Sequence, residues 1–498
     1  MPSPIAIFLD FNLPNATTWL YFSFLLAMAL FFKFSRLLSV RNLDIVMVFL
    51  LVPGLLVQQA SRPQPMPIEQ EPVVQVASLF GHGAMPETPA AMAGYVANFT
   101  QRCGAALEKH SWLWVGYLWL LLGSVYFFCR CLLDLTLVQR PALGPNLQTG
   151  GLAWLAGALL ICLLAVAYRQ VESDINLLPT SPSALSPGGR VQNEGAGAIL
   201  PPSQTHTHPF FAVAILWREW PTWAVAALAF GCHIAVVVAL VLISWRHFQD
   251  RASGMAAVTF YLLLPYTGLY VGQLTHILPM ALFMGTLLAY RRPTLAGCIL
   301  GIATATTYFP LFVLPIWLSF YRGRGAGRFI TAFLLAVALV LLCIAVTLHL
   351  ADELQQTISN FVDSPAWQPW KDLSGEKTPP EGFWTGVPAA YRIPVFLLYL
   401  SFVFGTRFWP APKNLAHVIA LCAAVFIGLQ WWWADRGGVY VLWYLPLLLL
   451  LTFRPFLQDR VAPPITADTD WLTRSLRWCL HSGRRIIHWG EPAQKNRV

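Results

Sequence analysis

Residues 287–328 read "LLAYRRPTLAGCILGIATATTYFPLFVLPIWLSFYRGRGAGR", two short apolar runs between two arginine clusters. Neither run, 294–308 or 309–321, reaches the about 20 residues that a full membrane span needs. Taking 294–321 as one span would put the two clusters on opposite sides, whereas Lys and Arg gather on one side of a membrane. We therefore expect the chain to leave and return to the same side, as a tilted hairpin or a re-entrant loop, with a break at Tyr308.

The same charge rule orders the whole chain. Alternate connecting segments on the side of the arginine clusters hold 22 of the 32 basic residues and 7 of the 23 acidic ones. The remaining residues hold 10 basic and 16 acidic groups. The basic side is predicted to be cytoplasmic, with the N-terminus outside and the C-terminus inside. The net charge of +9 thus records orientation and does not indicate a nucleic-acid partner.

Composition predicts the fold class. Of 498 residues, 57% are hydrophobic and only 11% are charged, against about 25% charged in an average soluble domain. We expect an all-α, polytopic transmembrane helical bundle of about 11–13 spans over residues 1–453. A basic amphipathic tail, 454–498, is expected to lie on the cytoplasmic membrane surface. The candidate spans are 17–33, 44–58, 112–129, 151–168, 222–244, 255–271, 275–290, 294–308, 309–321, 329–350, 393–405, 414–433 and 438–453.

Three long loops, 59–111, 169–221 and 351–392, are placed on the outer side. The first becomes helix-like towards "AAMAGYVANFTQRCGAALEKH", and the third is rich in Trp and acidic residues. Most extra-membrane residues before the tail therefore face outward. If the protein has a site, we expect it on that side.

Polar residues also gather where spans meet the outer side, and such residues are functional candidates. The turn "YTGLYVGQLTHILP" places Gln273 and His276 at the outer surface, with Pro265 and Pro279 expected to break the adjoining helices. The bland interpretation is a Gln/His pair that satisfies the broken backbone. A binding role is the alternative.

Two further outer positions carry arginine. Tyr391 and Arg392 open one span, and Asp435 and Arg436 precede the last one. A guanidinium can hold phosphate oxygens bidentately, so both arginines are candidate phosphate ligands. The alternative for each is an arginine that extends along a helix end to the interface.

Acid–base chemistry needs a carboxylate, and Asp10, Glu71 and Glu87 are outer candidates. No P-loop, dinucleotide-binding, HExxH or GxSxG pattern is present. We expect no cofactor and no protein-bound metal site, because His206 and His208 alone are too few ligands to define one. A divalent metal stays an open alternative.

The residues from about 250 to 455 resemble bacterial polyprenol-phosphate-mannose-type mannosyltransferases of the C-type, multi-span glycosyltransferase superfamily. The similarity rests on Gly272–Gln273 after a span, an arginine-rich inner turn, a small-residue helix, the break at Tyr308-Phe-Pro and a basic inner loop. The final "DRGGVYVLWYLPLLLL" is also similar. Two departures stand out: loop 59–111 contains no Asp, and Tyr308 occupies a position where a Lys is often found.

The resemblance implies transfer of a mannose-like hexose from a polyprenyl-phosphate donor to a lipid or cell-envelope acceptor, at the outer face of a bacterial inner membrane. It implies that Glu87 or Glu71, in the first long outer loop, is the base. Asp10 is a less favoured candidate for the same role. Arg392 and Arg436 would hold the leaving phosphate, and the outer tryptophans, Trp370 among them, would stack on sugar. Gln273, His276, Tyr308, Tyr391 and Asp435 complete the expected substrate-binding set.

Two other function classes are weighed against this one. A transporter or lipid flippase would place charged pairs or broken helices at mid-membrane, often in two matching halves. The chain has proline breaks but neither a mid-span carboxylate nor evident halves, and His233, His276 and His349 are the residues to check. A non-catalytic relative is the remaining alternative, because loop 59–111, where the resemblance implies an acidic base, contains no Asp.

Overall fold

The computed structural model describes residues 16–61, 89–136, 144–176, 220–350, 389–433 and 437–454, together with 354, 355, 358, 383, 384 and 387. Every regular element within these residues is a helix, so the predicted all-α class is confirmed. The longer helices are α2 (Ala16–Phe31), α3 (Val40–Ala60), α5 (Pro89–Asp134), α6 (Thr149–Asn176), α8 (Thr222–Arg246), α9 (Arg251–Leu263), α11 (Leu274–Leu288), α12 (Pro293–Thr307), α14 (Ala326–Leu350), α16 (Arg392–Gly405), α17 (Leu415–Trp432) and α18 (Leu445–Phe453).

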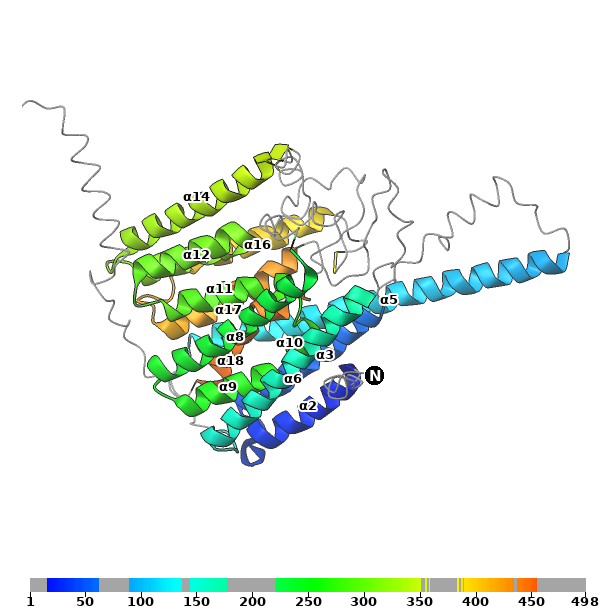
Figure 1. Ribbon diagram of the computed structural model, residues 1–498, viewed down its shortest axis with the longest axis horizontal. Coiled ribbons are helices and arrows are strands. Elements are labelled where there is room, and N and C mark those ends of the chain that lie inside the picture. The colour runs from blue at the N-terminus through cyan, green and yellow to red at the C-terminus, as the bar shows by residue number, and fades with distance from the viewer. Residues whose placement is uncertain are drawn as a thin grey trace, which may run out of the picture.

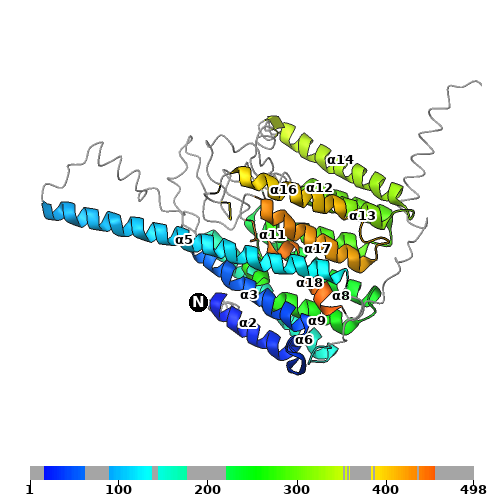
Figure 2. The same ribbon diagram turned by 180° about the vertical axis from the view of Figure 1, so that it is seen from behind.

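Short elements connect or extend these helices. They are α10 (Pro265–Leu269), α13 (Leu314–Phe320) and the 3-10 turns η1 (Phe34–Arg36), η5 (Phe309–Val313), η7 (Ala389–Tyr391) and η8 (Val441–Trp443). The helices run roughly alongside one another, with α14 at one edge of the bundle and α2 at the other (Figures 1 and 2).

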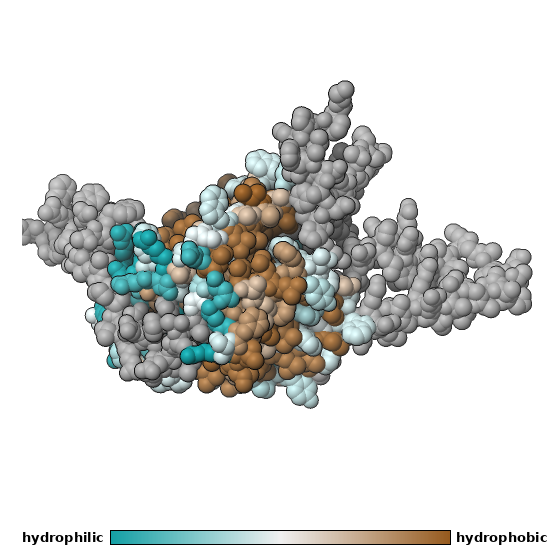
Figure 3. Space-filling model, turned by 90° about the horizontal axis from the view of Figure 1, so that it is seen from below, coloured by the Kyte–Doolittle hydropathy of each residue, from teal (hydrophilic) through white to brown (hydrophobic). Residues whose placement is uncertain are grey.

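Six of the described helices are long and apolar enough to cross a membrane, and several shorter apolar helices lie among them. A belt of hydrophobic surface crosses the face seen in Figure 3, and hydrophilic residues gather beyond its edge. The chain is therefore a multi-pass membrane protein. Helix α5 also continues beyond the bundle (Figures 1 and 2), which accounts for the helix-like end of loop 59–111.

The two ends of segment 287–328 meet at one end of the bundle. The Tyr321 hydroxyl donates to the Tyr290 carbonyl at 2.7 Å, so the residues before α12 and after α13 are neighbours. Helix α12 ends at Thr307, the chain turns at Tyr308, and η5 and α13 return. The predicted break at Tyr308 is confirmed, and the two runs begin and end on the same side.

Two prolines that were expected to break helices behave differently. Helix α9 ends at Leu263 and α10 begins at Pro265, so the first break is confirmed. Pro279 instead lies inside α11, which continues to Leu288, so the second expectation is wrong. Helices can continue through proline where neighbouring segments satisfy the freed backbone groups, and α11 packs against α8, α12 and η8.

Hydrogen bonds join distant connecting segments at one end of the bundle. We call it the basic end, because the segments that the charge rule assigns to this side hold 22 of the 32 Lys and Arg residues. Lys33 bonds Asn146 at 2.6 Å, and Lys413 bonds Ser319 at 3.0 Å. These residues lie in, or next to, connections that the charge rule places together. Four connections that the charge rule places on one side therefore meet here in two pairs.

A four-residue ion network crosses the basic end. The Arg130 guanidinium contacts Asp44 at 3.0 Å and Asp134 at 3.1 Å, and Arg454 contacts Asp134 at 3.2 Å. Both buried aspartates are therefore paired with arginine. Arg41, at the same end, donates to the Phe31 carbonyl at 3.1 Å.

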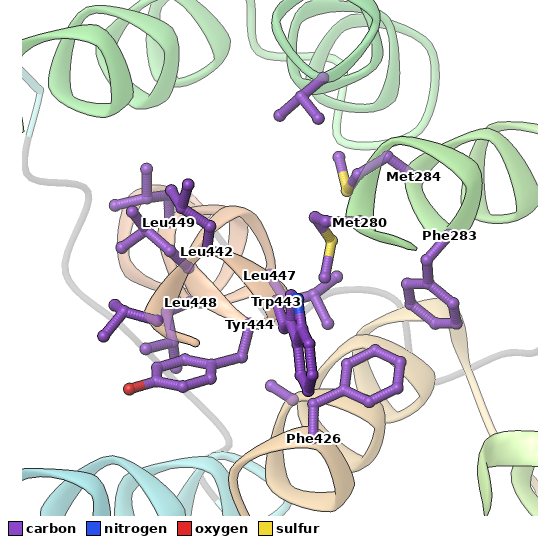
Figure 4. Close-up of a cluster of buried hydrophobic side chains, with 14 of the residues drawn as sticks. Met280, Phe283, Met284, Phe426, Leu442, Trp443, Tyr444, Leu447, Leu448 and Leu449 are labelled. Atoms are coloured by element: carbon purple, nitrogen blue, oxygen red, sulfur yellow. The ribbon is translucent and has the colours of Figure 1, made fainter. Parts of the chain in front are cut away.

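Among the six long apolar helices the most deeply buried is α17, of which 89% is enclosed by protein against 28% for α14. Asn414 caps its first turn, accepting from the His417 backbone N–H at 2.8 Å. Beside it, the segment from η8 to α18 packs its tryptophan and leucines against α11 and α17. Figure 4 shows the side chains that meet there: Met280, Phe283, Met284, Phe426, Leu442, Trp443, Tyr444, Leu447, Leu448 and Leu449.

Candidate functional site

Three interruptions of the helices meet at the opposite end of the bundle. We call it the acidic end, because the segments that the charge rule assigns to this side hold 16 acidic and 10 basic residues. The interruptions are the turn 270–273 before α11, the break at Tyr308 and the segment 437–444 before α18. The Trp443 indole N–H donates to the Thr275 carbonyl at 3.2 Å. Phe309 stacks on Trp443 with ring centroids 4.2 Å apart. Interruptions that are far apart in the sequence therefore form one structural unit.

An unbroken series of rings joins these segments, and we call it the aromatic stack: Tyr270, His276, Tyr440, Trp443 and Phe309. Successive centroid distances are 3.9 Å, 5.0 Å, 4.1 Å and 4.2 Å. Close, offset aromatic pairs each contribute about 0.5–1.5 kcal/mol beyond the area they bury. All five residues are buried, so the stack fixes the three segments relative to one another.

His276 differs from its sequence-based expectation in one respect. It was expected at the outer surface, yet it is buried between Tyr270 and Tyr440, with its ring nearly parallel to that of Tyr270. Gln273 is half-buried and forms the N-cap position of α11. The surface placement of His276 is wrong because the 437–444 segment covers it. Its role in binding stays a prediction.

The side chain of Gln430 organises the segment that follows α17. Its carbonyl oxygen accepts from the Gly438 N–H at 2.8 Å and the Tyr440 N–H at 3.3 Å, and its amide donates to the Tyr440 carbonyl at 3.2 Å. Gly438 has a φ of +94°, which favours glycine. A Cβ at Gly437 would collide with the main-chain carbonyl oxygen of Gln430. Both glycines of the "GG" pair are therefore required by the backbone path.

Arg392 enters the site from α16. It is the first residue of that helix, is 1% exposed, and its Nε donates to the Trp432 carbonyl at 3.3 Å. The adjoining Trp433 ring lies 6.0 Å from the ring of Tyr308. An arginine that extends along the helix to the interface would be exposed, and Arg392 is not. The structure thus brings Arg392 and Tyr308 to neighbouring residues at the end of α17.

Trp384 lies on the same helix end. Its indole N–H donates to the Trp431 carbonyl at 2.8 Å, and its side chain is buried. Trp431 in turn donates to the Ser124 hydroxyl at 2.9 Å on α5. In this arrangement Trp384 fastens its segment to α17. Tyr391, by contrast, is 65% exposed and available to a ligand.

The charges described at the acidic end come from arginine. The carboxylates whose side chains the structure describes are Asp44, Asp134 and Asp250, and all three lie at the basic end. Asp250 caps α9 there, accepting from the Ala252 N–H at 2.9 Å. The predicted bases Asp10, Glu71 and Glu87 lie outside the described residues, as do Trp370, Asp435 and Arg436. No group of three potential metal ligands occurs within the described part of the chain.

The residues relevant to a transporter lie in a different environment. His233 is fully buried in α8, and its Nδ1 lies 2.7 Å from the Tyr261 hydroxyl. Its partner is thus a phenol and not a carboxylate. His349 lies in the last turn of α14. Charged pairs of the kind that mark ion pathways are absent from the described middle portions of the spans.

Sequence reasoning missed Tyr440, Trp443 and Gln430. Gln430 carried a usable signal, because it is a polar residue within the apolar run 414–433 and is followed by Gly437 and Gly438. The stacking of Tyr440 and Trp443 carried none, because it depends on contacts with segments more than 130 positions away.

Comparison with protein-family models matches residues 208–455 to glycosyltransferase family 87. No curated protein and no solved structure matches the chain. The matched region runs from the residues before α8 to the end of α18. It therefore includes the whole aromatic stack, Gln430 and Arg392.

Proposed function

The chain belongs to glycosyltransferase family 87, and from this premise we propose that it moves a mannose-like hexose from a polyprenyl-phosphate donor to a lipid or cell-envelope acceptor. The reaction would take place at the acidic end, on the outer face of a bacterial inner membrane. The basic end, with its Lys and Arg excess, would face the cytoplasm.

The observation that carries the proposal is the convergence at the acidic end within the matched region. A buried arginine, Arg392, lies where three interrupted helices meet. Irregular backbone at membrane depth is tolerated where it is enclosed by protein or lines a cavity. Such interruptions bring backbone and side-chain polar groups to the membrane edge, where a lipid-linked sugar phosphate would be presented.

Helix α16 suits a donor that joins a phosphate to a hydrocarbon chain. Arg392 opens the helix, and Leu397 and Leu398 further along it are exposed by 56% and 72%. A phosphate near Arg392 would leave the prenyl chain beside these lipid-facing leucines. The exposed Tyr391 and the predicted Trp370 would offer ring faces to the sugar, with Gln273 and Asp435 as further candidate hydroxyl ligands.

The proposed step is a group transfer. The acceptor hydroxyl oxygen forms a bond to the anomeric carbon, while the bond from that carbon to the phosphate oxygen breaks and polyprenyl phosphate leaves with the electron pair. A carboxylate takes the acceptor's proton. Glu87, Glu71 and Asp10 are the proposed candidates for this base. Arg392 and Arg436 would stabilise the charge on the leaving phosphate.

The test uses purified full-length protein in liposomes with polyprenyl-phosphate mannose, glucose or galactose and a membrane extract that supplies acceptors, and follows loss of the donor and formation of labelled product. We expect consumption of at least one donor. Glu87→Gln and Arg392→Gln should lower the rate by about 10²-fold or more. Arg36→Gln, at the basic end, is the matched control and should leave the rate unchanged.

Two results would contradict the proposal. If none of the donors is consumed when natural acceptors are present, the proposed sugar transfer is wrong. If the liposomes instead move intact lipid-linked sugar between leaflets, measured by protection from an external reagent, the transporter alternative is correct.

A further inference from the structure

Five arginines at the basic end form a second feature that the proposed reaction does not use. We call them the arginine rim: Arg291, Arg292, Arg322, Arg324 and Arg328. Arg291, Arg292 and Arg322 are exposed, and the other two are half-buried. We infer that the arginine rim binds the phosphate headgroup of an anionic membrane lipid.

The rim is a single site because its two turns touch. A Cβ at Gly325 would meet Pro293 Cγ at 3.2 Å and Arg328 Nε at 3.5 Å. The hydrogen bond from the Tyr321 hydroxyl to the Tyr290 carbonyl joins the same two turns. Arginines that are about 30 positions apart in the sequence are therefore held side by side.

Tyr290 links a rim arginine to a neighbouring histidine. Its hydroxyl lies 2.9 Å from Arg291 Nε and 2.7 Å from His247 Nδ1, and its side chain is buried. One phenol thereby positions a rim arginine and adds an imidazole beside it. Preorganised guanidinium groups lose less side-chain freedom when they bind an anion.

The described carboxylates at the basic end are engaged by other groups. Asp44 and Asp134 are engaged by Arg130 and Arg454, and Asp250 caps α9. Arg324 Nη1 is buried and makes no hydrogen bond to the described residues. The parallel helices α12 and α14 also begin here with no acidic residue in their first turns, so their dipoles add to the positive potential.

The neighbouring surface indicates a lipid and not a soluble anion. Helix α14 carries Arg328 in its first turn and exposes Leu334, Leu335 and Leu339 further along, by 57%, 51% and 61%. At ~1.5 Å of rise per residue, Leu334 lies about 9 Å deeper in the membrane than Arg328. A phosphate at the rim would thus have its acyl chains beside the leucines.

The inference is tested with the full chain in zwitterionic detergent, by native mass spectrometry of bound phosphatidylglycerol and phosphatidylcholine. We expect selective retention of phosphatidylglycerol. Arg322→Gln should weaken its affinity about fivefold, since a basic side chain near an anionic surface contributes ~1 kcal/mol. Arg36→Gln removes the same charge from the same end, outside the rim, and should change the affinity less than about twofold.

Thermal unfolding in phosphatidylcholine confirms that each variant is folded, and Arg292→Gln replaces Arg322→Gln if that variant is not. Equal losses in the rim and control variants would overturn the inference, because general charge would then explain binding. Displacement of phosphatidylglycerol by millimolar inorganic phosphate would also overturn it, in favour of a soluble anion. Transfer activity is not measured in this experiment, so its outcome is independent of the proposed function.

Discussion

Gly297 of α12 and Phe329 of α14 are so close that a Cβ at Gly297 would collide with the Phe329 carbonyl oxygen. One turn later, a Cβ at Gly301 would lie 2.5 Å from the Phe333 carbonyl oxygen. This close approach depends on small residues, as in other pairs of membrane helices. It is the most extensive helix pairing in the described bundle.

Replacing Gly297 with valine should therefore force the two helices apart. We expect the free energy of unfolding to fall by about 1–3 kcal/mol or more, seen as a lower midpoint of thermal unfolding in detergent. Gly231→Ala is the matched control, because Gly231 lies in α8 with open space around it. That change should stabilise the helix by about 0.5–1 kcal/mol. Equal midpoints for the two variants would show that α12 and α14 do not approach each other this closely.

The ion network at the basic end gives a second prediction. Arg130 contacts both Asp44 and Asp134, whereas Arg454 adds a second contact to Asp134. Arg130→Met should cost about 3–5 kcal/mol, because it leaves buried carboxylates without their main partner. Arg454→Met should cost less, since Asp134 keeps Arg130. The comparison uses unfolding midpoints of the two variants, and a larger loss in Arg454→Met would contradict the assigned pairing.

The same network shows what the sequence could and could not predict. Hydropathy and charge were enough for the all-α class, the break at Tyr308 and the return of 287–328 to one end of the bundle. The identity of Arg454 as a partner could not be predicted, because it lies 320 residues from Asp134. Such a pairing depends on how α18 packs, and no local pattern encodes that.

The candidate site divides in the same way. Arg392 and Tyr308 were found from their places at helix interruptions, because polar residues at such places are rare and informative. The burial of His276 was not foreseen, since its cover comes from Tyr440 in a distant segment. Gln430 was overlooked because one amide in an apolar helix has no period or spacing to mark it.

Lys413 gives a prediction about pH. Burial, and next the positive charge of Arg407, lower the pKa of Lys413 to about 8 from its usual 10.5. Between pH 8 and 10.5 the unfolded chain therefore holds more protons at this group than the folded one. Burial of the charged lysine therefore destabilises the folded protein fully below about pH 8, and this destabilisation becomes smaller as pH rises across that window.

The measurement compares unfolding midpoints at about pH 7.5 and about pH 9.5, on either side of the lowered pKa. Wild type should gain stability relative to Lys413→Met as pH rises, since only the lysine titrates at this position. Arg407→Gln should shrink the gain, because it removes a charge that lowers the pKa. A difference between wild type and Lys413→Met that does not change with pH would contradict the lowered pKa.

Gln430 provides the sharpest test of how the acidic end works. Its amide makes three hydrogen bonds to residues 438 and 440, which adjoin the predicted ligands Asp435 and Arg436 in the sequence. Gln430→Ala would leave these buried backbone groups unpaired, at about 1–3 kcal/mol each. Gln430→Glu keeps the accepted bonds from Gly438 and Tyr440 but loses the donated one. If the 437–440 segment positions the donor, KM for polyprenyl-phosphate sugar should rise strongly in the alanine variant and less in the glutamate variant, with the protein still folded by its unfolding transition. An unchanged KM in Gln430→Ala would mean that this segment holds the fold and takes no part in binding the donor.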